Sequence, residues 1–377
     1  MTGRNRLAIL GPAPPDRGGI ARETERLARE LAHGGPVSYF TFSRGYPRWL
    51  DPRRFAAFQT ADASPAVPVL DWRSPASWRR TAEEIAREAP AAVIVPWWTA
   101  FWGVSVRTVL RRVGRIDPAV RRILICHNVE DHEATALHRF LSLGAFLAAD
   151  AFLVHSESAR RSLARLVPGR PVAMHPLPAT EVERPDREAA RRRLGIDRPL
   201  VLFLGLLRRY KGVEVLLSAA PRIVRETGAI LAIVGESFSD AEDLERRWRD
   251  SPVRDNVRRR DAYVAEGEMA DWLAACDVLV LPYWKISGSA MAARALSARR
   301  PMAASRVGAL AETVVSGVTG ELFEPGDVDG LVRAVERVLS RGLDAYAPGL
   351  DEAARRLSWP SYTAALRTLL SSVGAKV

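Results

Sequence analysis

The chain has 377 residues, of which 47% are hydrophobic and 26% charged, and its net charge is +11. This composition is typical of a globular protein rather than a disordered one, and the length favours two domains over one. No apolar run approaches the roughly 20 residues that cross a bilayer, and no signal-peptide pattern precedes the first expected strand, so we expect a cytoplasmic protein.

The positive charge favours anionic partners, which are either phosphates in a cleft or an anionic membrane surface. No nucleic-acid partner is expected, because the chain has no zinc-finger spacing, RNA-binding aromatic motif or basic tail. Much of the arginine lies in helical segments such as 79–88 and 187–195. The alternative explanation of the positive charge is therefore an ordinary solvated surface. Cys126 and Cys276 both lie in apolar segments and are expected to be buried thiols in a reducing compartment.

The first part of the chain alternates strands and helices. A strand over 6–10 is followed by a loop with Gly18 and Gly19 and then by a helix over 20–32. A glycine pair at the start of a helix permits close approach of the backbone to an anion, although many such loops hold none. Further elements are expected in this part of the chain: a helix over 78–88 and strands over 92–95, 122–126 and 151–155.

Two groups of side chains follow these strands. Trp97, Trp98 and Trp102 come at the end of strand 92–95, where they either pack in the core or line a sugar or lipid site. Strand 122–126 leads to a second polar group, namely His127, Asn128, Glu130, Asp131, His132 and Glu133. Two histidines five residues apart in a loop fit no common zinc spacing, so no metal site is expected there.

A proline-rich segment around 175–198 reads as a linker, and strands and helices alternate again after it. The helix that begins at Val213 is expected to kink at Pro221. The fold class is therefore α/β, with two Rossmann-like domains facing a central cleft. We expect an N-terminal domain over 1–176, a C-terminal domain over 177–350, and a last helix within 351–377 that returns to the first domain.

The stretch VLFLGLLRRYKG, residues 201–212, carries the clearest chemical signal. Its uninterrupted apolar run predicts a strand over 201–207 that is buried on both faces. Arg208, Arg209 and Lys211 then fall near the carboxyl end of that strand, where open α/β sheets bind ligands. These cations, facing the start of a helix, could neutralise a diphosphate. The alternative is an ordinary strand-to-helix loop with solvated cations.

Several stretches, in this order along the chain, resemble the retaining glycosyltransferases of family 4, which have the GT-B fold: PPDRGGIARETERLARELA, ICHNVEDHE, FLVHSESAR, LFLGLLRRYKGVEVLL, CDVLVLPY and RPMAASRVGALAETVVSGVTGELF. The resemblance covers nearly the whole chain. It implies transfer of a sugar from a UDP- or GDP-sugar to a glycan or polyprenyl-linked acceptor in bacterial cell-envelope or exopolysaccharide synthesis. It implies no metal or other cofactor.

The resemblance also implies site residues. Arg208 and Lys211 match the pair that holds the donor diphosphate, and His127 matches the histidine that contacts the donor sugar, so these three are the expected catalytic residues. Glu312 matches an acidic position that is either functional or structural. The expected donor-binding residues are Gly18 and Gly19 at the phosphates or acceptor, Gly235 and Glu236 after the next strand, Tyr263 and Val264 at the nucleobase, and Ser287, Gly288 and Ser289 at the β-phosphate.

The chain departs from the family pattern at three positions. Ile286 and Arg294 stand where the family has two glutamates, of which the second usually binds the nucleotide ribose, and Arg299 replaces a usual glycine. An active transferase is therefore weighed against a non-catalytic GT-B protein that binds a nucleotide or a partner transferase. A sugar-nucleotide epimerase is a third reading.

A peripheral contact with an anionic membrane, at the inner face of the plasma membrane, is a further expectation. The helix over 20–32 and the loop over 42–49 place arginines next to apolar and aromatic residues. The alternative is a solvated helix face beside a packed loop.

Overall fold

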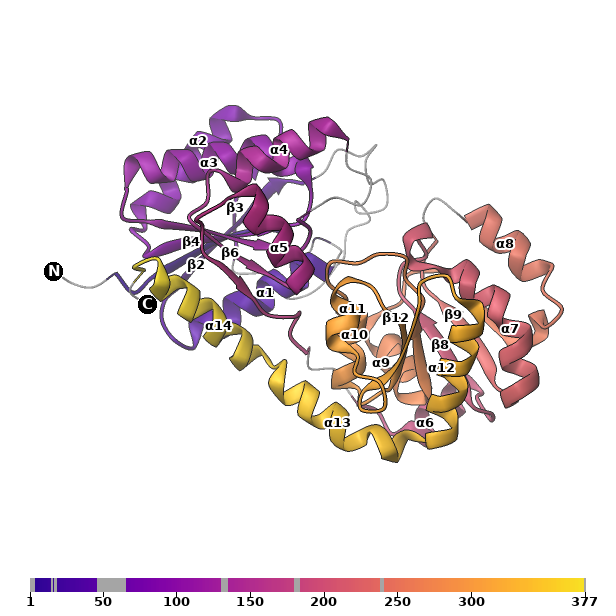
Figure 1. The fold of residues 1–377 in the computed structure, drawn as a ribbon. Coiled ribbons are helices and arrows are strands. Elements are labelled where there is room, and N and C mark those ends of the chain that lie inside the picture. The colour runs from indigo at the N-terminus through magenta and orange to yellow at the C-terminus, as the bar shows by residue number, and fades with distance from the viewer. Residues whose placement is uncertain are drawn as a thin grey trace. The chain divides into compact units, whose positions relative to one another are not determined.

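The computed structural model describes residues 4–14, 16, 19–45, 66–129, 135–179, 184–237 and 241–375. The chain divides into two compact units, Met1–His175 with Trp359–Val377, and Pro176–Ser358 (Figure 1). Each unit is built on a parallel sheet, which confirms the α/β class and the two Rossmann-like folds. Cys126 and Cys276 are buried and unpaired, as expected.

The sheet of the first unit has seven strands in the order β3-β2-β1-β4-β5-β6-β7. The strands are β1 (Leu7–Leu10), β2 (Val37–Arg44), β3 (Val67–Asp71), β4 (Ala92–Trp97), β5 (Arg121–Cys126), β6 (Ala151–Val154) and β7 (Val172–Met174). The helices are α1 (Gly19–Ala32), α2 (Pro75–Arg87), α3 (Gly103–Ile116), α4 (Ala136–Phe146), α5 (Glu157–Leu166) and α14 (Trp359–Ser372), with a short 3₁₀ turn η1 (Ala100–Trp102).

Both faces of this sheet are covered, which is why its central strands are apolar throughout. One face packs with Ile85 of α2, Val109 of α3 and Phe146 of α4. The other packs with Leu31 of α1 and Leu366 of α14. The C-terminal helix thus completes a core that begins more than 300 residues earlier in the sequence.

The sheet of the second unit has six strands in the order β10-β9-β8-β11-β12-β13. The strands are β8 (Leu200–Leu204), β9 (Ile230–Val234), β10 (Val257–Arg260), β11 (Val278–Leu281), β12 (Met302–Ser305) and β13 (Gly320–Phe323). The helical segments are α6 (Arg187–Leu194), η2 (Arg209–Lys211), α7 (Val213–Thr227), α8 (Ala241–Arg249), η3 (Arg254–Asn256), α9 (Glu266–Ala275), α10 (Ala290–Ser297), α11 (Gly308–Thr313), α12 (Val328–Arg341) and α13 (Leu343–Arg356).

Strand β8 is fully buried, as the apolar run predicted, but it ends at Leu204 instead of at residue 207. Gly205 adopts a φ of +130° and turns the chain out of the strand direction. Leu207 then returns to make an isolated bridge with Ser237, which lies beyond β9. The basic residues therefore follow a turn rather than the strand itself.

Helix α7 begins at Val213, as expected, and continues through Pro221 to Thr227, with buried residues such as Leu216 and Ile223 on both sides of the proline packed in the core. The chain re-enters the first unit at Trp359, within the segment 351–377 where the sequence placed this return. Helix α13, with buried Tyr346 and Leu350, packs in the core of the second unit.

None of the helices in the described ranges combines the length and the apolar character that a bilayer-spanning helix requires.

Candidate functional site

The second unit presents a group of loops at the carboxyl edge of its sheet. Strands β9, β8 and β11 are parallel neighbours, so the segments that follow them leave the sheet at one edge. The chain moves outward from β8 to β9 and β10 and then crosses to β11 on the other side of β8. Such a reversal of strand order is where open α/β sheets bind ligands.

Lys211 lies at this reversal. Its Nζ atom is 5.2 Å from the centroid of the Tyr283 ring, and a Cβ atom at Gly205 would lie 3.2 Å from that Nζ. Burial, with a smaller contribution from the charge of nearby Arg208, lowers the pKa of Lys211 to about 8. No ion pair to Lys211 occurs among the described residues. A largely buried ammonium group with a cationic neighbour is suited to an anionic ligand.

Ser289 adds a helix N-terminus to the same place. It caps α10, with its Oγ accepting a hydrogen bond from the backbone N–H of Ala292 at 3.2 Å. Burial raises the pKa of Tyr283 and the Ser289 hydroxyl opposes this effect, so Ser289 lies near the tyrosine hydroxyl. We call Arg208, Lys211, Tyr283 and Ser289 the cation cluster. Ser287 and Gly288, also expected at the site, precede the cap in the same loop.

Gly235 and Glu236 run beside the turn that leads to the cation cluster. The N–H of Leu207 donates to the carbonyl oxygen of Glu236 at 2.9 Å. Gly235 has a φ of +150°, and a Cβ atom there would lie 1.9 Å from the carbonyl oxygen of Gly205. Only glycine allows the two turns to approach this closely.

Tyr263 and Val264 lie in the loop before α9. The Tyr263 side chain is exposed, whereas Val264 is buried in the core of the unit, so its side chain is withdrawn from solvent. Glu312 lies on α11 and is partly exposed. The structure thus places these residues in the second unit without adding them to the cation cluster.

The structure shows the contacts or backbone conformation at each of the three positions that depart from the family pattern. Arg294, on α10, makes a two-pronged ion pair with Glu266 at the start of α9, with N–O distances of 2.7 and 3.1 Å. Arg299 adopts a φ of +55°, a left-handed conformation that favours glycine and explains why glycine is usual there. The carbonyl oxygen of Ile286 fills the space next to Gly308, whose Cβ position lies 1.7 Å away.

The remaining expected site residues belong to the first unit. Gly19 begins α1 and is exposed, and Gly18 lies outside the described residues. His127 follows β5, and its N–H donates to the carbonyl oxygen of Trp97 at 2.8 Å. Asn128 donates from Nδ2 to the carbonyl oxygen of Trp98 at 3.1 Å. The acidic stretch 130–133 also lies outside the described residues.

Of the three tryptophans, Trp97 and Trp102 are buried in the core and Trp98 is partly exposed. The Trp97 ring meets the Phe146 ring edge-on, with 5.5 Å between the centroids. The core-packing interpretation is confirmed for Trp97 and Trp102.

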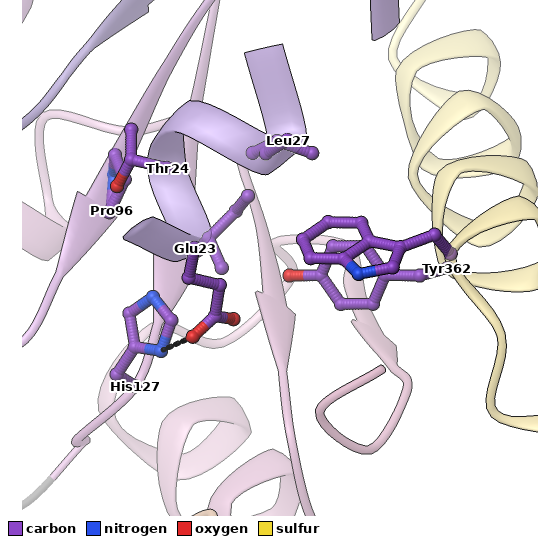
Figure 2. Close-up of a pocket in the computed structure, with 8 residues that line it drawn as sticks. Glu23, Thr24, Leu27, Pro96, His127 and Tyr362 are labelled. Atoms are coloured by element: carbon purple, nitrogen blue, oxygen red, sulfur yellow. Dashed lines mark ion pairs between the residues drawn. The ribbon is translucent and has the colours of Figure 1, made fainter. Parts of the chain in front are cut away.

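Sequence reasoning missed a polar group around His127. The Nδ1 atom of His127 is 3.9 Å from Oε2 of Glu23 on α1, and the ring centroids of His127 and His155 are 4.9 Å apart (Figure 2 shows Glu23 and His127). Burial lowers the pKa of His127, and it lowers that of His155 to about 4. Burial also raises the pKa of Glu23 to about 8, so the group is neutral at pH 7.

One sequence signal could have found the two histidines. Each directly follows a buried strand, and the register pairs Cys126 with Val154, so the next residues, His127 and His155, are neighbours. Glu23 had no such signal, because it lies on a helix more than 100 residues away in the sequence.

Solved structures match over nearly the whole chain. Sucrose-phosphate synthase from Thermosynechococcus elongatus gives a TM-score of 0.76 at 20% identity, covering 98% of this chain and 99% of that chain. HepE from Anabaena, in complex with UDP, gives a TM-score of 0.75 at 15% identity, covering 97% and 100%. At these identities the likeness shows the fold, and the protein is of the GT-B class, built from two Rossmann-like domains.

Sequence comparisons find similarity to glycosyltransferases. Residues 198–341 match the model "Glycosyl transferases group 1". D-inositol 3-phosphate glycosyltransferase 2 from Catenulispora acidiphila is 29% identical over 293 residues, 72% of this chain and 66% of the relative. The corresponding enzyme from Xylanimonas cellulosilytica is 32% identical over 190 residues, 48% of this chain and 44% of the relative. Residues 198–341 of the chain thus resemble the group 1 glycosyltransferases, which agrees with the resemblance that the motifs indicated.

The matched regions span two thirds or less of these two curated relatives.

Proposed function

We propose that this protein is a retaining glycosyltransferase that takes a sugar from a UDP- or GDP-sugar. The observation that carries the proposal is the buried ammonium of Lys211, beside Arg208 and the capped start of α10, at the carboxyl edge of the second sheet. The solved HepE structures, one with UDP and one with UDP-glucose, support a nucleotide-sugar donor for this fold.

The proposed reaction depends on stabilising the leaving group. The bond between the anomeric carbon and the β-phosphate oxygen breaks, and its electron pair goes to the diphosphate. The acceptor hydroxyl oxygen forms the new bond on the same face, and its proton goes to the departing phosphate. Lys211, Arg208 and the N–H groups at the start of α10 would counter the growing charge, which is the role that a metal has in other phosphate sites. The proposed transfer therefore needs no metal.

For the acceptor, we propose only a chemical class. Our expectation is a glycan or polyprenyl-linked acceptor in cell-envelope or exopolysaccharide synthesis. The names of the curated relatives add a phosphorylated cyclitol, D-inositol 3-phosphate, to the acceptors that should be tried.

A non-catalytic GT-B protein is the second candidate. The arginine at position 294 favours it, since the family has its ribose-binding glutamate there. The ion pair between Arg294 and Glu266 supports activity instead, because it holds the Glu266 carboxylate near the position of the missing glutamate.

Calorimetry with UDP, GDP, UDP-glucose and GDP-mannose, followed by transfer assays with each acceptor class, tests the two candidates. Transfer that is lost in Lys211→Ala and Arg208→Ala, with folding intact, supports the enzyme. Nucleotide binding without transfer or donor hydrolysis across the panel supports the non-catalytic protein. Wild-type transfer rates in both variants would refute the assignment of the phosphate site.

A peripheral membrane contact is also part of the proposal. On α1, the arginines expected at the interface are partly neutralised, since Arg26 pairs with Glu30 at 2.8 Å and Arg29 pairs with Glu25 at 2.9 Å. The loop residues 46–49 lie outside the described part of the chain. The α1 surface therefore offers less charge than its sequence suggests.

Helices α3 and α4 offer a better surface, on the same side of the first sheet (Figure 1). Phe140 and Leu137 of α4 are 66% and 63% exposed. Arg107 and Arg111 of α3 line an adjacent groove, and Arg107 lies against Gly144 of α4. Neither arginine makes an ion pair with the residues that the structure describes. Exposed apolar side chains beside such arginines suit an anionic lipid surface at the inner face of the plasma membrane.

A further inference from the structure

The first unit contains a buried polar group, Glu23, His127 and His155, that the proposed transfer does not use as a whole. Glu23 comes from α1, His127 follows β5 and His155 follows β6. One ligand atom from each lies within 4.8 Å of the others. In Figure 2 the Glu23 carboxylate points at His127, and the Tyr362 side chain of α14 lies on the other side of the carboxylate.

His155 is oriented in the way that metal-binding histidines are. Its Nδ1 atom is 3.1 Å from the carbonyl oxygen of His175, so Nδ1 carries the proton and Nε2 carries the lone pair. His175 is itself held by a 3.0 Å contact between its Nε2 and Oγ of Ser361. A histidine that donates its second N–H to a backbone carbonyl is the usual outer-sphere arrangement at a metal.

The Nε2 atom of His155 is buried and has no hydrogen-bond partner among the described residues, and the whole side chain is 1% exposed. A buried acceptor of this kind costs free energy unless a donor or a cation meets it. The adjoining cavity, which Glu23 and His127 line, offers no cationic side chain either, because its eight lining residues include no lysine or arginine.

The distances between the three ligand atoms suit one small ion. A cavity of about 10 Å³ adjoins the group: Glu23 and His127 line it together with the apolar side chains of Leu27, Pro96 and Ile125, whereas His155 lies outside its lining. Three atoms no more than 4.8 Å apart lie at most about 2.8 Å from a common centre. Zinc–nitrogen bonds measure roughly 2.0–2.1 Å, so each ligand needs to move inward by less than about 1 Å.

We propose that Glu23, His127 and His155 bind one divalent transition-metal ion, with zinc as the best match. Two imidazoles and one carboxylate suit zinc, nickel or copper, whereas magnesium and calcium prefer oxygen ligands. The ion restores a charge to Glu23 and joins the start of α1 to the ends of β5 and β6. An ion at Nδ1 of His127 leaves Nε2 for a sugar hydroxyl, so the site is compatible with the role expected of His127 and does not rest on the proposed transfer.

The test is zinc uptake by the full chain after treatment with a chelator. Isothermal calorimetry with zinc chloride gives affinity and stoichiometry, elemental analysis after dialysis gives retained metal, and cobalt absorption reports the coordination geometry. The variants are Glu23→Gln, which keeps the side-chain shape, and His155→Ala. His33→Ala is the matched control, because His33 is an exposed histidine 3.7 Å from Glu30 on the same helix region.

We expect one zinc ion per chain, bound with micromolar or tighter affinity. Loss of an outer-sphere group typically weakens metal affinity by roughly 10- to 100-fold, so loss of a ligand in Glu23→Gln or His155→Ala should weaken it by about 100-fold or more. His33→Ala should bind as the wild type does.

Absence of saturable uptake by the wild type would overturn the proposal and leave a single ordered water in the cavity. Affinity within threefold of wild type in both variants would also overturn it. Melting curves without metal establish that each variant is folded. If His155→Ala does not fold, the isosteric Glu23→Gln decides alone.

Discussion

Replacing Lys211 with methionine separates the stability of the second unit from its proposed function. Methionine keeps an unbranched chain of similar length without the charge. A pKa of about 8 in place of the ordinary 10.5 means that protonated Lys211 costs the folded protein up to about 3 kcal/mol at pH 7. The value is an upper bound, because the residue is partly exposed. Lys211→Met should therefore stabilise the ligand-free protein while it weakens UDP binding.

The free-energy cost of protonated Lys211 depends on pH in a definite direction. The folded-state pKa is depressed, so the full cost is present below pH 8 and disappears as the pH rises to 10.5, where the unfolded chain also loses the proton. The stability difference between Lys211→Met and the wild type should accordingly be largest near pH 7 and shrink between pH 8 and 10.5.

Chemical denaturation at pH 7 and pH 10, with calorimetry for UDP, measures both quantities. Lys285→Met is the control, since Lys285 is exposed and its removal should change stability by no more than about 0.5 kcal/mol. A destabilised Lys211→Met protein, or one that binds UDP with wild-type affinity, would refute the argument that the Lys211 ammonium lowers stability in order to bind an anionic ligand.

Four further outcomes are expected. UDP affinity of the wild type should fall as the pH rises above about 8, because Lys211 loses its proton, and calorimetry from pH 7 to 10 measures this. Glu266→Gln should weaken UDP binding by about ten- to a hundredfold if its carboxylate meets the ribose, with pyrophosphate affinity unchanged. Gly212→Ala, at a φ of +64° with its Cβ 1.9 Å from a carbonyl oxygen, should cost more in unfolding free energy than Gly228→Ala, at +66° in open space, which costs about 1–2 kcal/mol. Phe140→Asp should reduce flotation with anionic liposomes, and equal flotation of wild type and variant would argue against α4 as the contact.

Local patterns in the sequence predicted much of the fold. The burial of β8 followed from its apolar run, since a parallel strand covered on both faces must be apolar along its whole length. The place of Lys211 beyond that strand followed from the same reading. The resemblance to glycosyltransferases followed from motifs whose order along the chain is more specific than any one of them.

The ends of elements were predicted less well, because they depend on groups outside the element. Strand β8 ends at Leu204 because the turn at Gly205 pairs with the turn after β9.

The composition of the polar sites was decided by tertiary structure alone. Glu23 meets His127, and Arg294 meets Glu266, across 104 and 28 residues of sequence. Hydrophobic periodicity reports which side of an element faces a core, and it carries no information about which distant side chain lies opposite. Folding determines those pairs, because it brings the ends of parallel strands and the starts of their helices to one edge of each sheet.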